Sequence, residues 1–179
     1  MNKISLQSFS KINIGLKVLR ARQDGYHDIH TVFQELDFYD SILIKKKEEG
    51  CLFTSNVDWL SNNKANLCVK AWQCLVDHFD IAGVSIDLKK NIPPGSGLGG
   101  GSSNAACVLK GLSKLYNLNI CSKDLINIGS SIGADVPFFI NGGCQIGNGI
   151  GDKLIKINHD TENTFLLVMP DIHIDTKAA

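Results

Sequence analysis

The sequence has no excess of charge of either sign. Lysine and arginine total 18, aspartate and glutamate also total 18, and the formal net charge at pH 7 is zero. A balanced chain offers neither the basic stripe that attracts nucleic acid nor an acidic tail. We therefore expect a small-molecule partner and no nucleic-acid partner.

Long hydrophobic runs are also missing. No run approaches the roughly 20 apolar residues needed to cross a bilayer, although hydrophobic residues make up an ordinary 44% of the chain. Residues 1–9 alternate polar and apolar side chains, unlike the basic and then apolar pattern of a signal peptide. These features predict a cytoplasmic protein with no membrane partner.

Cysteine pairs are absent as well. None of the six cysteines belongs to a Cys-x-x-Cys motif, and cysteine is among the most buried residue types. We expect buried free thiols. His27 and His30 form an HxxH, but no second ligand pair stands at useful spacing, which argues against a zinc site.

The chain is predicted to alternate strands and helices, with no repeat or low-complexity linker, and its 179 residues suffice for one sizeable core. Hydrophobic periodicity separates the two element types. Strands are expected over residues 4–9, 12–18, 84–88 and 165–169, and helices over residues 66–79 and from Ser102 or Ser103 to Tyr116. Residues 42–46 and 51–54 are typical of a hairpin that turns at Glu49 and Gly50.

Residues 93–106 read PPGSGLGGGSSNAA and lie between a predicted strand and a predicted helix. Ordering glycine costs backbone entropy, so this concentration suggests that the backbone comes close to a ligand. A helix N-terminus attracts anions through its unpaired N–H groups and its dipole, and Ser102 or Ser103 is suited to cap it. The stretch indicates a phosphate-binding loop.

Three other interpretations of this stretch differ in the residues that they require. A Walker loop needs a lysine after its last glycine, and serines stand there instead. Gly95, Gly97 and Gly100 satisfy GxGxxG, but a dinucleotide fold would begin at the first strand, not after four others. A tight surface turn of glycines also fits the residues taken alone.

The pattern Pro-x-x-x-Gly-Leu-Gly-x-Gly-Ser-Ser-x-Ala-Ala resembles the second motif of the GHMP small-molecule kinases, which include galactokinase, homoserine kinase and mevalonate kinase. Two further segments are similar to the 4-diphosphocytidyl-2-C-methyl-D-erythritol kinase family within that superfamily: residues 11–16 (KINIGL) and residues 24–34 (DGYHDIHTVFQ). Asn66-Leu67, residues 129–139 and residues 147–152 continue the similarity. It covers nearly the whole chain.

The resemblance implies an α/β fold of the α+β type, in which helices cover a mixed sheet in two layers, as in domain 2 of ribosomal protein S5. Residues 1–170 would form the ATP-binding N-terminal domain, and residues 171–179 would begin the crossover to a C-terminal domain that this chain lacks. The implied reaction is ATP-dependent phosphorylation of the substrate's 2-hydroxyl, which gives the 2-phosphate and ADP in the non-mevalonate route to isoprenoids. The implied state is a monomer or a homodimer.

Two alternatives to that function stay open: another small-alcohol kinase of the superfamily, and a nucleotide-binding domain without turnover. Residue patterns alone would make Asp135 a helix cap or turn residue and Lys11 a solvent-facing side chain. The resemblance makes Asp135 the catalytic base and Lys11 the cation that favours the developing alkoxide.

The resemblance also implies the binding residues. Asn13 would bind the methylerythritol end of the substrate, and Tyr26 and His27 would contact the cytidine of its cytidine diphosphate group. Magnesium would lie beside Ser102 and Ser103, although Asp152 stands where the family more often has Glu and Phe9-Ser10 where it has Pro-Ala. The residues expected to bind ATP are Pro94, Gly95, Ser96, Gly97, Leu98, Gly99, Gly100, Gly101, Ser102, Ser103, Asn104, Asn66 and Lys90.

Overall fold

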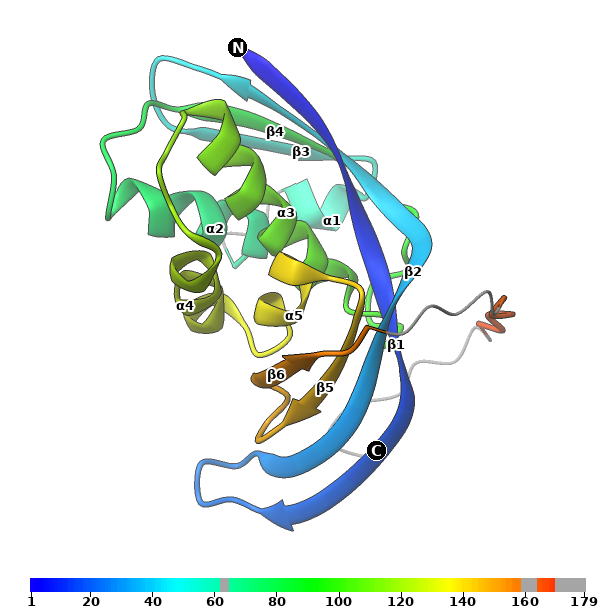
Figure 1. Cartoon of the computed structure of the whole chain (residues 1–179). Coiled ribbons are helices and arrows are strands. Elements are labelled where there is room, and N and C mark those ends of the chain that lie inside the picture. The colour runs from blue at the N-terminus through cyan, green and yellow to red at the C-terminus, as the bar shows by residue number, and fades with distance from the viewer. Residues whose placement is uncertain (62–64, 159–163, 170–179) are drawn as a thin grey trace.

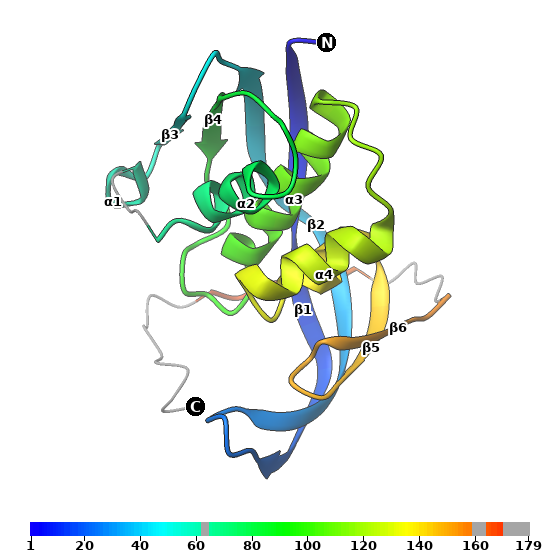
Figure 2. The ribbon, with the colours of Figure 1, turned by 90° about the vertical axis from the view of Figure 1, so that its left-hand side faces the viewer.

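The computed structural model describes residues 1–61, 65–158 and 164–169. The fold has two layers. A mixed sheet forms the first layer, and helices packed against one face of that sheet form the second (Figure 1). The turned view places α2, α3 and α4 in front of the strands (Figure 2). The elements are β1 (Lys3–Ala21), β2 (His27–Lys46), β3 (Cys51–Ser55), α1 (Asp58–Ser61), α2 (Leu67–Val76), β4 (Val84–Lys89), α3 (Gly100–Leu115), α4 (Ser122–Ile132), α5 (Val136–Asn141), β5 (Cys144–Asn148) and β6 (Lys153–Lys156).

The long strand β2 organises the sheet. It pairs with β1 along one edge, and along the other it pairs first with β5 and then with β4, all antiparallel. Strand β3 adds to β4 in parallel, and β6 adds to β5. The predicted two-layer α/β fold with a mixed sheet is confirmed.

The predicted hairpin of residues 42–46 and 51–54 is wrong. Both segments are strands, but β4 lies between them, so β2 and β3 do not pair. The reason is burial: Val84, Ile86 and Leu88 of β4 are all buried, whereas β3 buries only Phe53. The more apolar strand takes the interior position, and β3 becomes the edge.

Most of the other predicted elements are confirmed, and one is wrong. The strands over residues 4–9 and 12–18 are confirmed as parts of the single strand β1, and β4, α2 and α3 are confirmed. The strand predicted at residues 165–169 is wrong, because this segment has no regular structure and exposes Leu166 and Val168. The predicted crossover at residues 171–179 lies outside the described residues.

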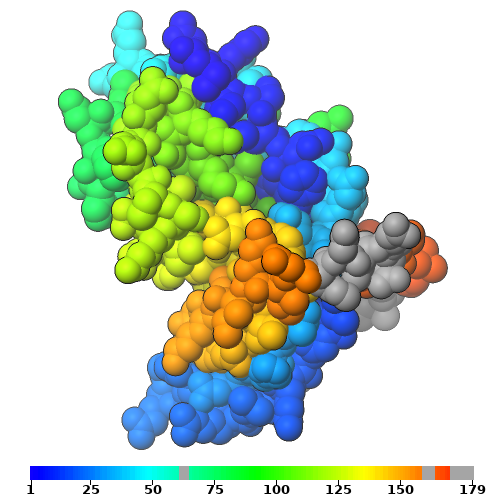
Figure 3. Space-filling view, in the orientation of Figure 1, coloured from blue at the N-terminus to red at the C-terminus, as the bar shows by residue number. Residues whose placement is uncertain are grey.

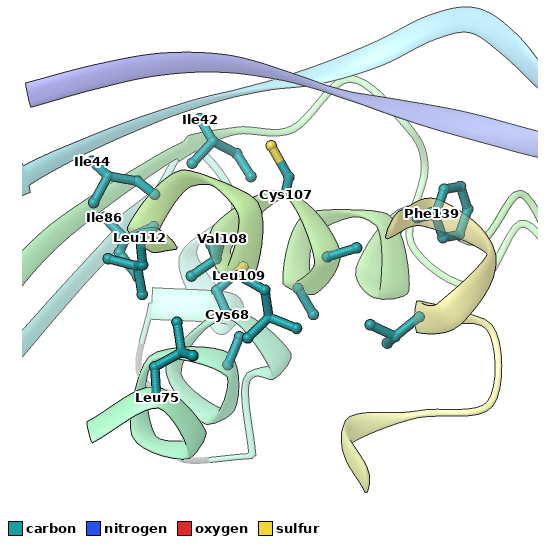
Figure 4. Packing of buried hydrophobic residues seen from close by; sticks show 14 of the residues in the cluster. Ile42, Ile44, Cys68, Leu75, Ile86, Cys107, Val108, Leu109, Leu112 and Phe139 are labelled. Carbon is teal, nitrogen blue, oxygen red and sulfur yellow. The ribbon is translucent and has the colours of Figure 1, made fainter. Parts of the chain in front are cut away.

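Helix α3 is the centre of the hydrophobic core. Gly111 lets it approach the sheet, since a Cβ there would lie 2.5 Å from Leu6 Cδ1 and 2.8 Å from Ile44 Cδ1. Apolar side chains of α3 pack between the sheet and α2 (Figure 4). The labelled members include Ile42, Ile44, Ile86, Val108, Leu109, Leu112 and Leu75.

The six cysteines are free thiols, as expected. Burial raises the pKa of Cys107 to about 12 and that of Cys51 to about 11. The expected burial holds for Cys68, Cys107 and Cys144, whereas Cys51 and Cys74 are only partly buried. Cys121 is exposed at the start of α4, where its thiol donates to Asp124. In the described part of the chain, no helix is long and apolar enough to span a membrane.

Candidate active site

The glycine-rich loop leads from β4 into the N-terminus of α3. Gly95, Gly97 and Gly99 all have positive φ angles, of 73°, 75° and 70°. Gly99 is the N-cap residue of α3, so the prediction that Ser102 or Ser103 caps this helix is wrong. A Cβ at Gly99 would lie 2.7 Å from the Phe139 ring and 3.2 Å from Lys11 Cγ, and only glycine meets both requirements.

Lys11 lies against this loop. Its backbone N–H donates to the Leu98 carbonyl at 3.0 Å, which ties β1 to the tip of the loop. Its side chain is 8% exposed, and Nζ lies 3.6 Å from Asp135 Oδ2. The ammonium also lies 4.8 Å from the centre of the Phe33 ring. Lys11 is therefore not a solvent-facing lysine, and its charge is held beside the loop.

Asp135 occupies the N-cap position of α5. Its side chain makes no capping hydrogen bond within the described part of the chain, and Pro137 provides a favourable first turn. The side chain is 35% exposed, so the carboxylate remains accessible to solvent although it lies beside Lys11. A carboxylate that is not used for capping can accept a proton from a ligand.

Asn13 and Thr31 extend the polar surface from Lys11 along the sheet. Lys11 Nζ donates to Asn13 Oδ1 at 2.9 Å, and Asn13 Nδ2 donates to Thr31 Oγ1 at 2.7 Å. The Thr31 hydroxyl in turn donates to the Gly15 carbonyl at 2.7 Å. This series fixes the orientation of the Asn13 amide relative to the ammonium.

A cavity of about 210 Å³ opens beside the loop, between α1, α2 and α3. Six of the residues expected to bind ATP line it: Asn66, Lys90, Pro94, Gly95, Gly101 and Asn104. Its wall also contains Trp59 and Leu60, which sequence reasoning missed because the short helix α1 gave no periodic signal.

Two of these cavity residues are held by the protein itself. Asn66 caps α2 by accepting from the Cys68 N–H at 2.8 Å, and it donates to the Leu60 carbonyl. Lys90 Nζ donates to Asp40 at 2.5 Å and to Asn104 Oδ1 at 3.3 Å. Both side chains therefore shape the cavity wall as well as line it.

Of the two serines at the start of α3, Ser103 is buried and Ser102 is partly exposed. The Ser103 hydroxyl lies 2.8 Å from that of Ser8 on β1. Ser102 faces the segment before α5, since a Cβ on Gly133 would lie 3.9 Å from Ser102 Oγ. Asp152, by contrast, accepts from the Ile150 N–H and closes a local turn.

Tyr26 and His27 lie at the tip of the β1–β2 ribbon, which projects past β5 and β6 in Figure 3. Tyr26 is 56% exposed. Ten positions along β1 separate Lys11 from Ala21, the register partner of His27, which is about 30 Å of extended strand. The structure thus does not bring Tyr26 and His27 into contact with Lys11, but strand alternation places His27 on the same face as Thr31 and Phe33.

Surface ion pairs hold the ribbon's tip. Arg22 bonds to both Asp24 and Asp28, and Arg20 Nε donates to Asp28 at 2.7 Å. These hydrogen bonds lower the pKa of both carboxyls. The largest cause is the bond from Arg22 at Asp24 and the bond from Arg20 at Asp28. The Asp24 carboxylate also accepts from the Tyr26 N–H, which sets the turn that presents Tyr26.

Residues 66–143, which include the loop, α3 and Asp135, match the N terminal domain of the GHMP kinases. The fold agrees with a crystal structure of 4-(cytidine 5'-diphospho)-2C-methyl-D-erythritol kinase, with a TM-score of 0.75 and 35% identity over 86% of this chain and 55% of that one. The glycine loop, α3 and Asp135 thus lie in the part of the chain that is similar to the N terminal domain of the GHMP kinases.

Curated relatives match nearly the whole chain. The chain is 42% identical over 179 residues to 4-diphosphocytidyl-2-C-methyl-D-erythritol kinase of Alkaliphilus oremlandii, covering 98% of this chain and 61% of the relative. It is also 42% identical over 173 residues to the kinase of the same name from Persephonella marina, covering 96% and 63%. The chain therefore spans about three-fifths of the length of these relatives.

More distant structures share the fold alone. Mevalonate kinase of Methanococcus jannaschii is 18% identical, with a TM-score of 0.64 over 87% of this chain and 56% of that one. The GHMP kinase domain thus keeps its architecture at low identity. Lys11, the glycine loop and Asp135 come together here from β1, the start of α3 and the start of α5.

Proposed function

We propose that this chain is the nucleotide-binding and substrate-binding part of a kinase that transfers the γ-phosphoryl group of ATP to the 2-hydroxyl of 4-diphosphocytidyl-2-C-methyl-D-erythritol, in isoprenoid precursor synthesis. The observation that carries the proposal is the pair formed by Lys11 and Asp135, 3.6 Å apart beside the glycine loop. Phosphoryl transfer needs positioning and charge stabilisation more than covalent chemistry, and this arrangement supplies both. The names of the relatives support the choice of substrate.

The substrate's 2-hydroxyl oxygen loses its proton and receives the phosphoryl group. The Asp135 carboxylate accepts the proton of the 2-hydroxyl as that oxygen attacks the γ-phosphorus. A new P–O bond forms while the bond from the γ-phosphorus to the bridging oxygen breaks, which leaves ADP. The positive charge of Lys11 stabilises the alkoxide as it develops.

The ATP phosphates would bind at the N-terminus of α3, where backbone N–H groups and the helix dipole favour anions. The adenosine would occupy the cavity next to the loop, between Trp59 and Asn66. Residues 1–170 would form this ATP-binding domain.

Magnesium fits the oxygen donors at the loop. The Ser102 hydroxyl is partly exposed and faces the segment that carries Asp135, whereas Ser103 is buried against Ser8. A hydroxyl, a carboxylate and substrate phosphates form a typical magnesium donor set, and the ion would neutralise charge on the phosphates. Ser102 is the better candidate of the two serines.

The substrate would lie along the face of the ribbon that carries Asn13 and His27. Asn13, oriented by Thr31, would bind the hydroxyls of the methylerythritol, while Tyr26 would stack on the cytosine and His27 would bond to its edge. The distance from the tip to Lys11 requires an extended substrate or a bend of the ribbon.

Titration of the 179-residue chain with CDP and with a non-hydrolysable ATP analogue tests binding, and a coupled ADP assay tests turnover. We expect both ligands to bind, and phosphorylation of the cytidine substrate but not of homoserine, mevalonate or galactose. Absence of CDP binding together with turnover of another alcohol would replace the proposed substrate. Binding of both ligands without turnover would reduce the function to a nucleotide-binding domain.

A further inference from the structure

A buried carboxylate lies behind the glycine loop. Asp40 of β2 is fully buried, and its two oxygens accept four hydrogen bonds. They come from Lys90 Nζ at 2.5 Å, the Asn91 N–H at 2.7 Å, the Ile92 N–H at 2.8 Å and Asn104 Nδ2 at 2.8 Å. Lys90 and Asn104 also line the cavity proposed for adenosine, whereas Asp40 itself does not line it.

The four donors flank the loop on both sides. Lys90, Asn91 and Ile92 precede the glycine-rich residues 95–101, and Asn104 follows them as the fifth residue of α3. One carboxylate therefore joins the segment entering the loop to the helix leaving it. Gly100 lies against the same cluster, since a Cβ there would be 2.8 Å from Lys90 Nζ.

The cluster is also tied to neighbouring strands and loops. Asn104 Nδ2 donates to Ser8 Oγ at 2.9 Å, and Ser8 bonds to Ser103. The Asn56 side chain exchanges two hydrogen bonds with the Lys90 backbone, at 2.7 and 3.1 Å. An ion pair that served only to neutralise Lys90 would need neither the backbone amides nor Asn104.

We propose that Asp40 is a positioning residue that presets the shape of the phosphate-binding loop. A loop held in its binding shape before the ligand arrives loses less conformational entropy on binding, which strengthens affinity without any new contact to the ligand. Asp40 acts through the backbone and through Asn104, and it does not touch the nucleotide. The identity of the ligand as ATP rests on the proposed function, whereas the shaping of the loop does not.

The first experiment measures the loop without nucleotide. Hydrogen exchange followed by mass spectrometry compares the wild-type chain with Asp40→Asn and with Asp87→Asn, an exposed aspartate on β4. We expect exchange over residues 91–104 to be at least about tenfold faster in Asp40→Asn, the scale of losing a hydrogen bond to a charged group, and unchanged in Asp87→Asn. Unchanged exchange in this segment, or equal acceleration in α4 and β5, would overturn the proposal.

The second experiment measures ATP affinity through the fluorescence of Trp59, which lines the cavity. With magnesium and ATP as the probe, we expect the Kd of Asp40→Asn to rise by about tenfold or more, while its Kd for CDP stays at the wild-type value. Equal weakening of ATP and CDP, or unchanged ATP affinity, would overturn the positioning role.

A milder variant covers the case in which Asp40→Asn fails to fold because Lys90 is left buried without a counter-charge. Asn104→Ala keeps the pair of Asp40 and Lys90 and removes the link from Asp40 to α3, together with the bonds of Asn104 to Ser8 and Lys90. We expect about threefold faster exchange over residues 99–104 and about threefold weaker ATP binding, with Asn91 and Ile92 unaffected. If neither quantity changes, the proposal is wrong. A wild-type chain that binds no ATP would instead overturn the proposed function, and the exchange data would still decide whether Asp40 shapes the loop.

Discussion

At its base the β1–β2 ribbon is enclosed by α3, α5 and the glycine loop, whereas at its tip each strand contacts mainly the other. The base carries Lys11, Thr31 and Phe33, all buried. The tip exposes Tyr26, Val18 and Leu19 and is held by surface ion pairs. The difference separates two tasks: the proposed chemistry lies where the fold is dense, and the proposed recognition of cytidine lies where little protein surrounds it.

Removal of the carboxylate at the base should have the largest effect. Asp135→Asn keeps the shape of the side chain but cannot accept a proton, so turnover should fall by about 100-fold or more while ATP affinity stays the same. Steady-state kinetics and nucleotide titration check this, with Asp124→Asn of α4 as the matched control. Near-normal turnover in Asp135→Asn would mean that the base is another group.

The next prediction tests the close approach of the glycine loop to Lys11. Gly99→Ala and Gly97→Ala both place a side chain at positive φ, which costs about 1–2 kcal/mol. Only at Gly99 would the methyl meet Phe139 and Lys11, because Gly97 has no atom within 4 Å among the described residues. We expect Gly99→Ala to have a free energy of unfolding about 2 kcal/mol lower than that of Gly97→Ala, as measured by urea denaturation. Equal losses would show that the loop can move away from Lys11.

At the tip, His27→Ala should change recognition alone. Loss of a hydrogen bond to the base edge should raise the KM for the cytidine substrate by roughly tenfold, with little change in the KM for ATP. His30→Ala is the control, because His30 lies on the opposite face of β2 and bonds to Asn148. An equal rise in both constants for His27→Ala would indicate that the tip does not bind the cytidine.

Ser10 and Ser8 test how the hydrogen bonding of buried hydroxyls at the base affects stability, and we expect a smaller effect. Both hydroxyls are buried, but Ser10 Oγ has no hydrogen-bond partner among the described residues, whereas Ser8 bonds to Ser103 and Asn104. Ser10→Ala should raise the free energy of unfolding by about 1 kcal/mol and Ser8→Ala should lower it by a similar amount. Thermal denaturation of the two variants compares them. Destabilisation by Ser10→Ala would show that its hydroxyl does have a partner.

The ion pairs of the tip should give the smallest effect. The pKa of Asp28 is lowered below its ordinary value, so its pairing stabilises the fold at neutral pH, and this contribution is lost as the pH falls from about 4 through the lowered pKa. Because the pairs are exposed, 0.5 M salt should remove most of the contribution. The difference in Tm between wild type and Asp28→Asn, followed from pH 7 to pH 2, should be small and should vanish in acid. A difference that persists at pH 2 would have another cause.

Much of the fold followed from local patterns in the sequence. Period-two alternation located β1 and β4, and apolar spacing located α2 and α3, since these patterns reflect which face of an element is buried. The glycine stretch identified a loop at a helix N-terminus without reference to any other segment. The resemblance of residues 11–16, 24–34 and 93–106 to a kinase family supplied the substrate hypothesis, which neither periodicity nor spacing contains.

Pairing and burial were decided only by the tertiary structure. The order of β2, β4 and β3 depends on which strand has the most apolar surface to bury, a comparison between segments that no local window makes. Gly99 replaced the serines as the cap because Phe139 and Lys11, far apart in the sequence, leave no room for a side chain there. Asp40 gave no signal among the charged residues of β2, and only its burial behind residues 90–92 and Asn104 shows what its charge holds together.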